Sequence, residues 1–183
     1  MYIEVETTIP GELAEATWQL YTEAFDELRT VAVQRHVMDR GEFDTVLGDK
    51  RVLKYLGHDP NRTDQLAALA TFTNELAAMP LISPDYFAHR WPDLYAGKRI
   101  WYIGFFAIHP AYRGSGLFEA IIADMWQRVQ ACDGIAALDI CRRNDTIGLG
   151  RAIHHTLTAL THGARASRMD EQTYWLYELP ARS

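Results

Sequence analysis

Cysteine is scarce in this 183-residue sequence, which contains only Cys132 and Cys141. The two form no Cys-x-x-Cys pair and no disulfide framework, which excludes the small disulfide-stabilised class and indicates a reducing compartment. The seven histidines include no His-Glu-x-x-His run and no Cys/His spacing typical of zinc, so we expect no metal site. A chain of this length buries enough surface to fold without such supports.

Long hydrophobic runs and an excess of positive charge are also missing. No stretch approaches the roughly 18 uninterrupted apolar residues of a membrane helix, and residues 1–6 lack the basic and apolar regions of a secretory signal. The 18 lysines and arginines are outnumbered by 24 aspartates and glutamates, a net charge of −6. A protein that binds nucleic-acid backbone is expected to carry the opposite sign. We therefore expect a cytoplasmic protein that binds neither membranes nor nucleic acid.

The residues present are those of one globular domain. Hydrophobic residues make up 48% of the chain and charged residues 23%, which excludes a disordered or fibrous class. No internal repeat, low-complexity segment or linker divides the chain. We expect a single domain over residues 1–183.

The first half reads as a strand, a helical region and a hairpin. Patterning predicts a strand at 2–6, one or two helices from 12 to about 40, a loop with at most one helical turn at 41–48, and strands at 51–56 and 66–72. The alanines of 66–72 favour helix by propensity, but the preceding turn favours a second hairpin arm. Residues 74–97, rich in proline and aromatic side chains, form either a long functional loop or a loop with a short helix.

The second half is patterned more clearly. Residues 100–108 are apolar on both faces, as in a covered central strand, and Gly104 within them indicates a bulge or a close approach. Phe118 to Val129 place apolar residues on one helical stripe. The remaining elements are predicted at 135–141 (strand), about 145–161 (helix), and 165–169 and 173–179 (strands).

The loop before the Phe118–Val129 stripe carries the chemistry. Arg113-Gly114-Ser115-Gly116 stands where the helix begins, and the first amides of a helix lack internal acceptors and carry partial positive charge. Glycines let an anion approach those amides, so the physical interpretation is an anion cradle clamped by Arg113. No lysine follows Gly116, which excludes a P-loop, and the spacing from the strand excludes a dinucleotide fingerprint.

The run Ile-His-Pro-Ala-Tyr-Arg-Gly-Ser-Gly-Leu (108–117), between a buried strand and an amphipathic helix, resembles the acetyl-CoA-binding motif of the GNAT superfamily of N-acetyltransferases. The resemblance implies one acyl-CoA N-acyltransferase domain of the α/β (α+β) class. It implies a central mixed, mostly antiparallel sheet of about seven strands, with helices on both faces. It also implies that the central strands 100–108 and 135–141 splay apart.

The same resemblance implies a coenzyme site. The pantetheine arm would pair with the strand end at Phe106, Ala107 and Ile108, and the Ile108 amide would polarise the thioester carbonyl. Asn144 matches a position near the pantetheine. The pyrophosphate would lie on the backbone amides of the loop and first helical turn, which are Arg113, Gly114, Ser115, Gly116, Leu117 and Phe118. Many members carry Gly or Ala where Phe118 stands.

The usual catalytic groups of that superfamily are missing. The strand 100–108 contains no carboxylate, and Ala159 stands where many members have a tyrosine. Tyr102 and His154 remain as candidate catalytic residues, with core packing as the alternative for Tyr102 and a solvated surface position for His154. Cys141 and His155 are further substitutes. Aromatic residues at 86–95, with Trp101 and Phe105, line either an acceptor pocket or a satellite hydrophobic cluster.

The resemblance implies an N-acetyltransferase that moves an acetyl group from acetyl-CoA to a primary amine, by direct attack in a ternary complex and without a metal. One alternative is a non-catalytic acyl-CoA-binding or regulatory protein of the same fold. Another is an acyltransferase with a different acyl donor or an oxygen acceptor. The sequence does not identify the acceptor, and a homodimer through carboxyl-terminal edge strands is open.

Overall fold

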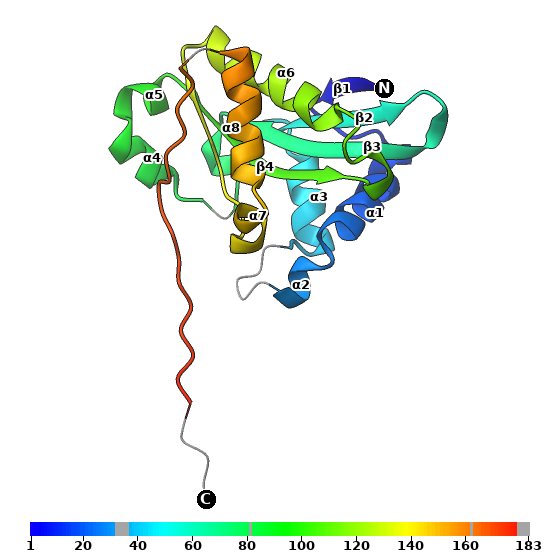
Figure 1. The fold of residues 1–183 in the computed structure, drawn as a ribbon. Coiled ribbons are helices and arrows are strands. Elements are labelled where there is room, and N and C mark those ends of the chain that lie inside the picture. The colour runs from blue at the N-terminus through cyan, green and yellow to red at the C-terminus, as the bar shows by residue number, and fades with distance from the viewer. Residues whose placement is uncertain (32–36, 81, 162, 179–183) are drawn as a thin grey trace, which may run out of the picture.

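A computed structural model describes residues 1–31, 37–80, 82–161 and 163–178. Its centre is a five-stranded sheet in the order β1-β2-β3-β4-β5 (Figure 1). The first three pairings are antiparallel and β4–β5 is parallel, as expected of a mixed, mostly antiparallel sheet. The strands are β1 (Tyr2–Glu6), β2 (Leu53–Asp59), β3 (Arg62–Thr73), β4 (Ile100–Ile108) and β5 (Ile135–Leu138).

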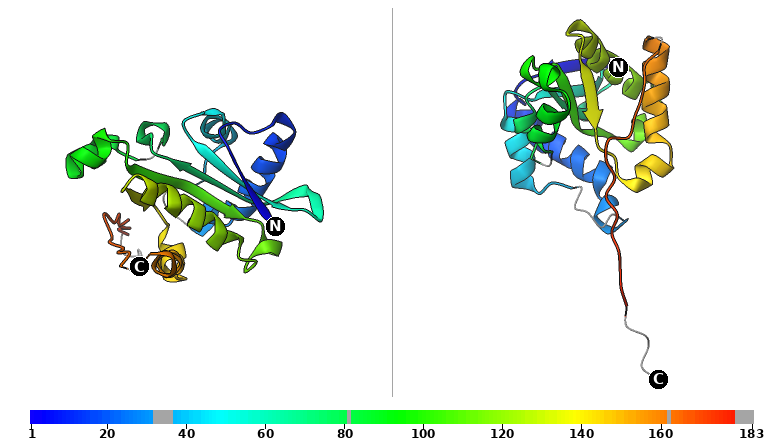
Figure 2. Two further views of the ribbon diagram at one scale, coloured as in Figure 1. Left: turned by 90° about the horizontal axis from the view of Figure 1, so that it is seen from above. Right: turned by 90° about the vertical axis from the view of Figure 1, so that its left-hand side faces the viewer.

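Helices cover both faces of this sheet (Figure 2). α1 and α3 pack on one face, where Tyr21 and Phe43 contact Phe105 of β4. α6 covers the other face with Ile121 and Met125, and α8 lies beside α6. The helices are α1 (Ala14–Phe25), α2 (Leu28–Val31), α3 (Arg40–Gly48), α4 (Pro84–Arg90), α5 (Pro92–Ala96), α6 (Leu117–Ala131), α7 (Arg142–Thr146) and α8 (Leu149–Leu160), with 3-10 turns η1 (Gly11–Leu13), η2 (Leu76–Ala78) and η3 (Pro110–Tyr112).

The predicted hairpin is confirmed, with longer arms than expected. β2 and β3 pair from Leu53↔Phe72 to Asp59↔Arg62. Ala67, Ala68 and Ala70 are fully buried in β3 despite their helical propensity. Small side chains suit this position because helices press on both faces of the strand, so tertiary packing overrides propensity.

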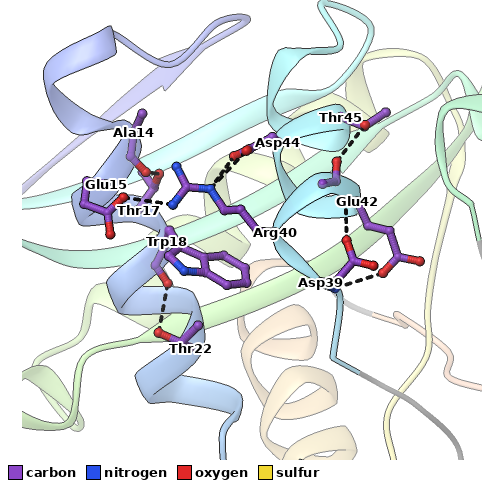
Figure 3. A network of polar contacts seen from close by, with 11 residues as sticks. Ala14, Glu15, Thr17, Trp18, Thr22, Asp39, Arg40, Glu42, Asp44 and Thr45 are labelled. Carbon is purple, nitrogen blue, oxygen red and sulfur yellow. Dashed lines mark hydrogen bonds and ion pairs between the residues drawn. The ribbon is translucent and has the colours of Figure 1, made fainter.

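Residues 41–48, expected to be a loop, instead belong to the helix α3. Asp39 accepts a hydrogen bond from the Glu42 N–H while the Glu42 side chain accepts from the Asp39 N–H, a reciprocal capping box. Figure 3 shows how Arg40 then bridges Glu15 of α1 and Asp44 of α3 above the Trp18 ring. The prediction was wrong because Gly41 and Gly48 were given the weight of loop residues, although they stand only at the helix ends.

The segment 74–97 contains helices, which decides between the two interpretations offered for it. Pro84 opens α4, and the Ser83 hydroxyl accepts a hydrogen bond from the Tyr86 N–H at 3.3 Å. Phe87 and Trp91 then pack in a cluster that includes Tyr102 of β4. No helix among the described residues is long and apolar enough to cross a membrane.

Two boundaries in the second half differ from the prediction. β5 ends at Leu138 instead of Cys141, and the single helix expected at 145–161 is divided into α7 and α8 at Gly148. Gly148 has φ +97°, a left-handed conformation that breaks a helix and suits glycine. Both differences lie in the part of the chain that comes directly after β5, where β5 and β4 separate.

The predicted strands at 165–169 and 173–179 are wrong for the described residues, 163–178, which include no strand. This segment instead runs as extended chain away from the body (red in Figure 1). The sheet therefore has five strands in the described structure instead of about seven. An alternating or apolar sequence pattern shows that a segment can be buried in a sheet. The segment forms a strand only where the edge of another strand is available for pairing.

Candidate active site

The two central strands separate partway along β4. Pairing runs from Ile100↔Ile135 to Ile103↔Leu138 and then stops. The rest of β4 continues to Ile108 with no partner on that side in the described structure. The expected splay is therefore present, and its fork lies just beyond Ile103.

A bulge in β4 coincides with the fork. Ala70 pairs with Phe106 and Phe72 with Ile103, so Gly104 and Phe105 together face Thr71. The Phe105 N–H donates to Thr71 Oγ1 at 3.2 Å. A Cβ on Gly104 would lie 2.7 Å from both Met79 Sδ and Thr71 Oγ1. Both possibilities raised for Gly104, a bulge and a close approach, are confirmed.

Past the bulge, backbone groups of β4 point into the gap. The His109 N–H donates to the Ala67 carbonyl at 3.0 Å. Bonded and non-bonded residues alternate along an antiparallel pair, so Ala107 also bonds to β3 while Phe106 and Ile108 face the other way. The N–H and C=O groups of Phe106 and Ile108 therefore face the side that β5 has left. This is an open strand edge inside the sheet.

The loop after β4 turns sharply into α6. Gly114 and Gly116 have φ of +73° and +83°, which side chains rarely adopt. The first bond within the helix runs from the Ala120 N–H to the Gly116 carbonyl at 3.0 Å. The amides from Gly116 to Glu119 therefore have no acceptor within the helix.

The loop is open to an incoming group. Residues 113–116 are exposed, and nothing lies within 4 Å of where a Cβ on Gly114 or Gly116 would be. In the described part of the chain the Arg113 side chain forms no ion pair. The Phe118 ring packs against Phe106 of β4, with ring centroids 5.0 Å apart. Phe118 thus ties the start of α6 to the strand edge.

Tyr102 and Asp139 meet at the fork. The Tyr102 hydroxyl donates to Asp139 Oδ1 at 2.5 Å. Burial first, and then the Asp139 charge, raise the pKa of Tyr102, so its hydroxyl keeps its proton at neutral pH. Asp139 directly follows the last paired residue of β5, and its carboxylate reaches the solvent.

Sequence reasoning missed Asp139 because it was counted inside a strand expected to run to Cys141. The available signal was its charge within the apolar run Leu138-Asp139-Ile140. A carboxylate is costly to bury without a partner, so its position directly after Leu138 indicated that the buried part of the strand ends there.

The other candidates are dispersed. His154 lies half-buried on α8 and lines the same cavity as Tyr102 and Asp139, but within the described residues it makes no hydrogen bond or ion pair with either. Cys141 is 8% exposed and belongs to the core beneath α1. Asn144 is half-buried on α7. No three His, Cys, Asp or Glu side chains of the described ranges gather at a possible metal position.

A cavity of about 1830 Å³ opens along the fork. Its walls come from β4, β5, α4, α8 and the segment after α8. Tyr86, Phe87 and Trp91 line it, and Phe87 and Trp91 also belong to the hydrophobic cluster around Tyr102, so the structure does not decide between the two sequence interpretations of these aromatic residues. Trp101 does not, because it stacks on Phe72 at 4.6 Å on the α6 face.

Together, the splayed central strands and the strand–loop–helix unit beside them give the chain the fold of the GNAT acetyltransferases. Among solved structures, the chain is similar to a GNAT-family acetyltransferase from Listeria monocytogenes, at 15% identity and a TM-score of 0.53, over 82% of this chain and 83% of that one. It also matches a mutant of the BH1408 protein from Bacillus halodurans at 16% identity and a TM-score of 0.55, over 96% of this chain and 100% of that one.

An aminoglycoside acetyltransferase from an uncultured soil metagenomic sample, meta-AAC0020 in complex with trehalose, matches at 10% identity and a TM-score of 0.52, over 97% of this chain and 96% of that one. No protein-family model matches the sequence, and no curated protein does. At these identities the likeness establishes the fold.

Proposed function

We propose that this protein is an acetyl-CoA-dependent N-acetyltransferase. One observation carries the proposal: the open strand edge at Phe106 and Ile108 leads from the fork toward the start of α6, where the first amides have no acceptor within the helix. An extended ligand with an anionic end fits such a path, because the edge binds an amide-bearing chain and the helix start binds phosphate. A thioester on a pantetheine arm has both features.

The resemblance implied that the diphosphate of coenzyme A lies on the amides of Arg113 to Phe118, but the N–H groups of Arg113 and Ser115 already donate to the carbonyls of Pro110 and Tyr112, at 3.3 and 3.2 Å. In this proposal the diphosphate therefore lies on the amides from Gly116 to Glu119. Those amides have no acceptor within the helix, and the helix dipole adds positive charge there. Arg113 supplies a charged donor from the loop. Gly114 and Gly116 keep side chains away from the phosphate oxygens.

The direction in which the pantetheine arm runs decides the roles of the N–H groups of Phe106 and Ile108. The arm starts at the loop that follows Ile108 and runs back along β4, so the thioester comes last and lies nearer the fork. Ile108 then pairs with the pantetheine, and the Phe106 N–H polarises the thioester carbonyl. The resemblance had implied that the Ile108 N–H polarises the thioester carbonyl. The direction of the arm along β4 favours the Phe106 N–H for this role instead.

Asp139 is the proposed general base, and Tyr102 positions it. An amine arrives as an ammonium and loses two protons on acylation. One passes through Asp139 to solvent, and the other reaches the coenzyme A sulfur as the C–S bond breaks and the C–N bond forms. Tyr102 keeps its own proton, so it acts as a donor that holds the Asp139 carboxylate at the fork.

The acceptor enters through the cavity beside the fork. Tyr86, Phe87 and Trp91 offer aromatic surface there, and Asp139 offers the charge that an ammonium needs. One of the similar structures described above, meta-AAC0020, is named as an aminoglycoside acetyltransferase. Aminoglycosides, polyamines and peptide amines therefore form the panel of acceptors for the transfer assay.

Calorimetry with acetyl-CoA tests the coenzyme site. Gly116→Val introduces a side chain at φ +83° among the proposed phosphate ligands, whereas Gly163→Val introduces the same strain at φ +82° beyond α8. We expect the wild type and G163V to bind acetyl-CoA and G116V to lose at least 10-fold in affinity. A wild type that binds neither acetyl-CoA nor free coenzyme A would contradict the proposal.

Release of free thiol tests the transfer. We expect thiol to appear when the protein is mixed with acetyl-CoA and at least one amine of the panel, and acetylated amine to appear in equal amount. Tight coenzyme binding with no thiol release across the panel would instead identify a non-catalytic acyl-CoA-binding protein. A longer acyl donor run in parallel distinguishes an acyltransferase of different donor preference.

A further inference from the structure

His109 joins the sheet to the coenzyme loop, residues 113–116, and the proposed reaction does not use its side chain. The residue directly follows β4, and η3 and the loop follow it. Its main chain is fixed on β3, because the His109 N–H donates to the Ala67 carbonyl at 3.0 Å. Its imidazole is 18% exposed and has neighbours on β3, α1 and η3. The ring therefore lies where the sheet passes into the loop.

The contacts of the ring decide which of its nitrogens carries the proton. His109 Nδ1 accepts a hydrogen bond from the Ala111 N–H at 3.2 Å. A ring nitrogen that accepts has no proton, so the neutral imidazole carries its proton on Nε2. The carboxamide of Gln65 lies 2.7 Å from Nε2, and because an N–H needs an acceptor, it turns its oxygen to the ring. The contact with Ala111 therefore requires the neutral form of His109.

A second proton on His109 breaks the contact with Ala111. Both nitrogens of an imidazolium are donors, so Nδ1–H and the Ala111 N–H would face each other without an acceptor. Glu23 of α1 lies 3.8 Å from Nε2 and favours the charged ring. Tyr112 of η3 lies edge-on to the imidazole, with ring centroids 5.8 Å apart, and β3 contributes the uncharged Gln65. The ring thus has one set of partners when neutral and another when charged.

The amide that His109 holds is the first one of η3. Pro110 opens this turn and has no N–H, so the Ala111 N–H is the first donor that the turn presents. The next residue, Tyr112, donates its hydroxyl to Asp59 Oδ2 at 3.1 Å, and the coenzyme loop follows directly. Loss of the His109 acceptor therefore frees the chain immediately before the loop.

We propose that His109 is a positioning residue of the coenzyme loop, which its neutral form holds in place and its protonated form releases. The inference rests on the proposed coenzyme site and adds that acetyl-CoA binding weakens in acid. Imidazole is the side chain that changes charge between about pH 5 and 8. One hydrogen bond changes an equilibrium by about threefold to tenfold, which sets the size of the expected effect.

Calorimetry with acetyl-CoA at pH 8 and pH 5.5 tests the proposal in His109→Asn. The Asn amide oxygen can accept the Ala111 N–H as at a helix start, and it gains no proton in this range. We expect H109N to bind as the wild type does at pH 8, within about threefold. Between the two pH values the wild type should lose about threefold to tenfold more affinity than H109N. The phosphates of the ligand titrate equally in both measurements, so their contribution cancels.

Two further variants provide the controls. His109→Ala removes the acceptor altogether and should weaken binding about threefold to tenfold already at pH 8. His89→Asn makes the same change as H109N on the exposed side of α4 and should keep the pH dependence of the wild type. Equal pH dependence of the wild type and H109N would overturn the proposal.

Nuclear magnetic resonance of the ligand-free protein tests the same contact without coenzyme. We expect the Ala111 amide resonance to move together with the imidazole resonances of His109 as the pH falls, and to stay in place in H109N. An Ala111 resonance that does not follow His109 would overturn the proposal even if acetyl-CoA binds. A coupled titration in a protein that binds no acetyl-CoA at either pH would support the hold of His109 on the loop and contradict the proposed function.

Discussion

A single hydrogen bond decides which side chain is best placed for proton transfer in the proposed reaction. Tyr102 of β4 and Asp139, which directly follows β5, meet at the fork, where Tyr102 is buried and Asp139 reaches solvent. The buried tyrosine keeps its proton, so the carboxylate is the partner able to accept one. His154, the other candidate from the sequence, lines the same cavity without contacting this pair.

Asp139→Asn should therefore slow transfer without weakening coenzyme binding. Loss of a general base typically costs about 10²–10⁴-fold, and we expect kcat to fall by that amount while the acetyl-CoA dissociation constant is unchanged. Tyr102→Phe should lower kcat by less, since it removes only the positioning bond, and should leave the KM for acetyl-CoA within about twofold. His154→Gln serves as the comparison. Normal kcat in D139N with a low kcat in H154Q would reverse the assignment.

Asp49 predicts an acid-sensitive contribution to stability. The Arg51 guanidinium, bonded to Asp49 Oδ2 at 2.6 Å, lowers the pKa of Asp49 from 3.8 to about 2. A carboxyl whose pKa is lower in the folded state stabilises the fold above its unfolded pKa, and this contribution is lost as the pH falls from about 4 to about 2. Arg51 is half exposed, so we expect about 1 kcal/mol or less.

Urea unfolding of the wild type and Asp49→Asn at several pH values measures this contribution. The difference in free energy of unfolding between the two proteins should be present at pH 7 and disappear near pH 2. Lys54 donates to the backbone carbonyl of Asp49 and keeps that bond in the variant. A difference that is equal at pH 7 and pH 2 would show that the ion pair contributes nothing.

At the scale of elements, the bulge in β4 creates the site. Gly104 and Phe105 face Thr71 alone, and β5 pairs only as far as Ile103. Beyond Ile103, β4 thereby separates from β5, and the N–H and C=O groups of Phe106 and Ile108 face the gap between the two strands. The sequence predicted this strand with its true bounds and its bulge, because apolar runs and an internal glycine are local signals.

Gly104→Ala should destabilise the fold. The added Cβ meets Met79 Sδ and Thr71 Oγ1 at 2.7 Å, and although Met79 can move, Thr71 is held by the Phe105 N–H. Overpacking of this kind costs about 1–3 kcal/mol. Gly48→Ala, at the end of α3 where nothing lies within 4 Å, should change stability by no more than about 1 kcal/mol and in the stabilising direction. Equal urea midpoints for G104A and G48A would contradict the close approach.

Other elements were harder to predict because their signals are ambiguous without neighbours. Gly41 and Gly48 indicated a loop, yet Asp39 and Glu42 cap a helix whose Phe43 and Leu47 are buried against α1. Cys141 continued an apolar run, yet β5 had already ended at Leu138. Both errors arise where the decisive contact comes from a distant part of the chain.

At the scale of the whole molecule, the proposed coenzyme site predicts that stability depends on acetyl-CoA. A ligand that binds only the folded chain stabilises it by about 2.7 kcal/mol at 100 times its dissociation constant, by mass action. We expect acetyl-CoA to raise the urea midpoint of the wild type and to leave that of G116V almost unchanged. A wild-type midpoint that does not respond to acetyl-CoA would contradict the coenzyme site.

Sequence alone determined the unit from Ile100 to Ala131: a covered strand, a glycine loop and an amphipathic helix. Their signals are periodicity and backbone freedom, which belong to neighbouring residues. Tertiary structure alone decided where β5 ends, that Tyr102 meets Asp139, and that residues 173–178 lie unpaired. Each of these depends on which edges and charges come together across the sheet, and residues far apart in the chain supply them.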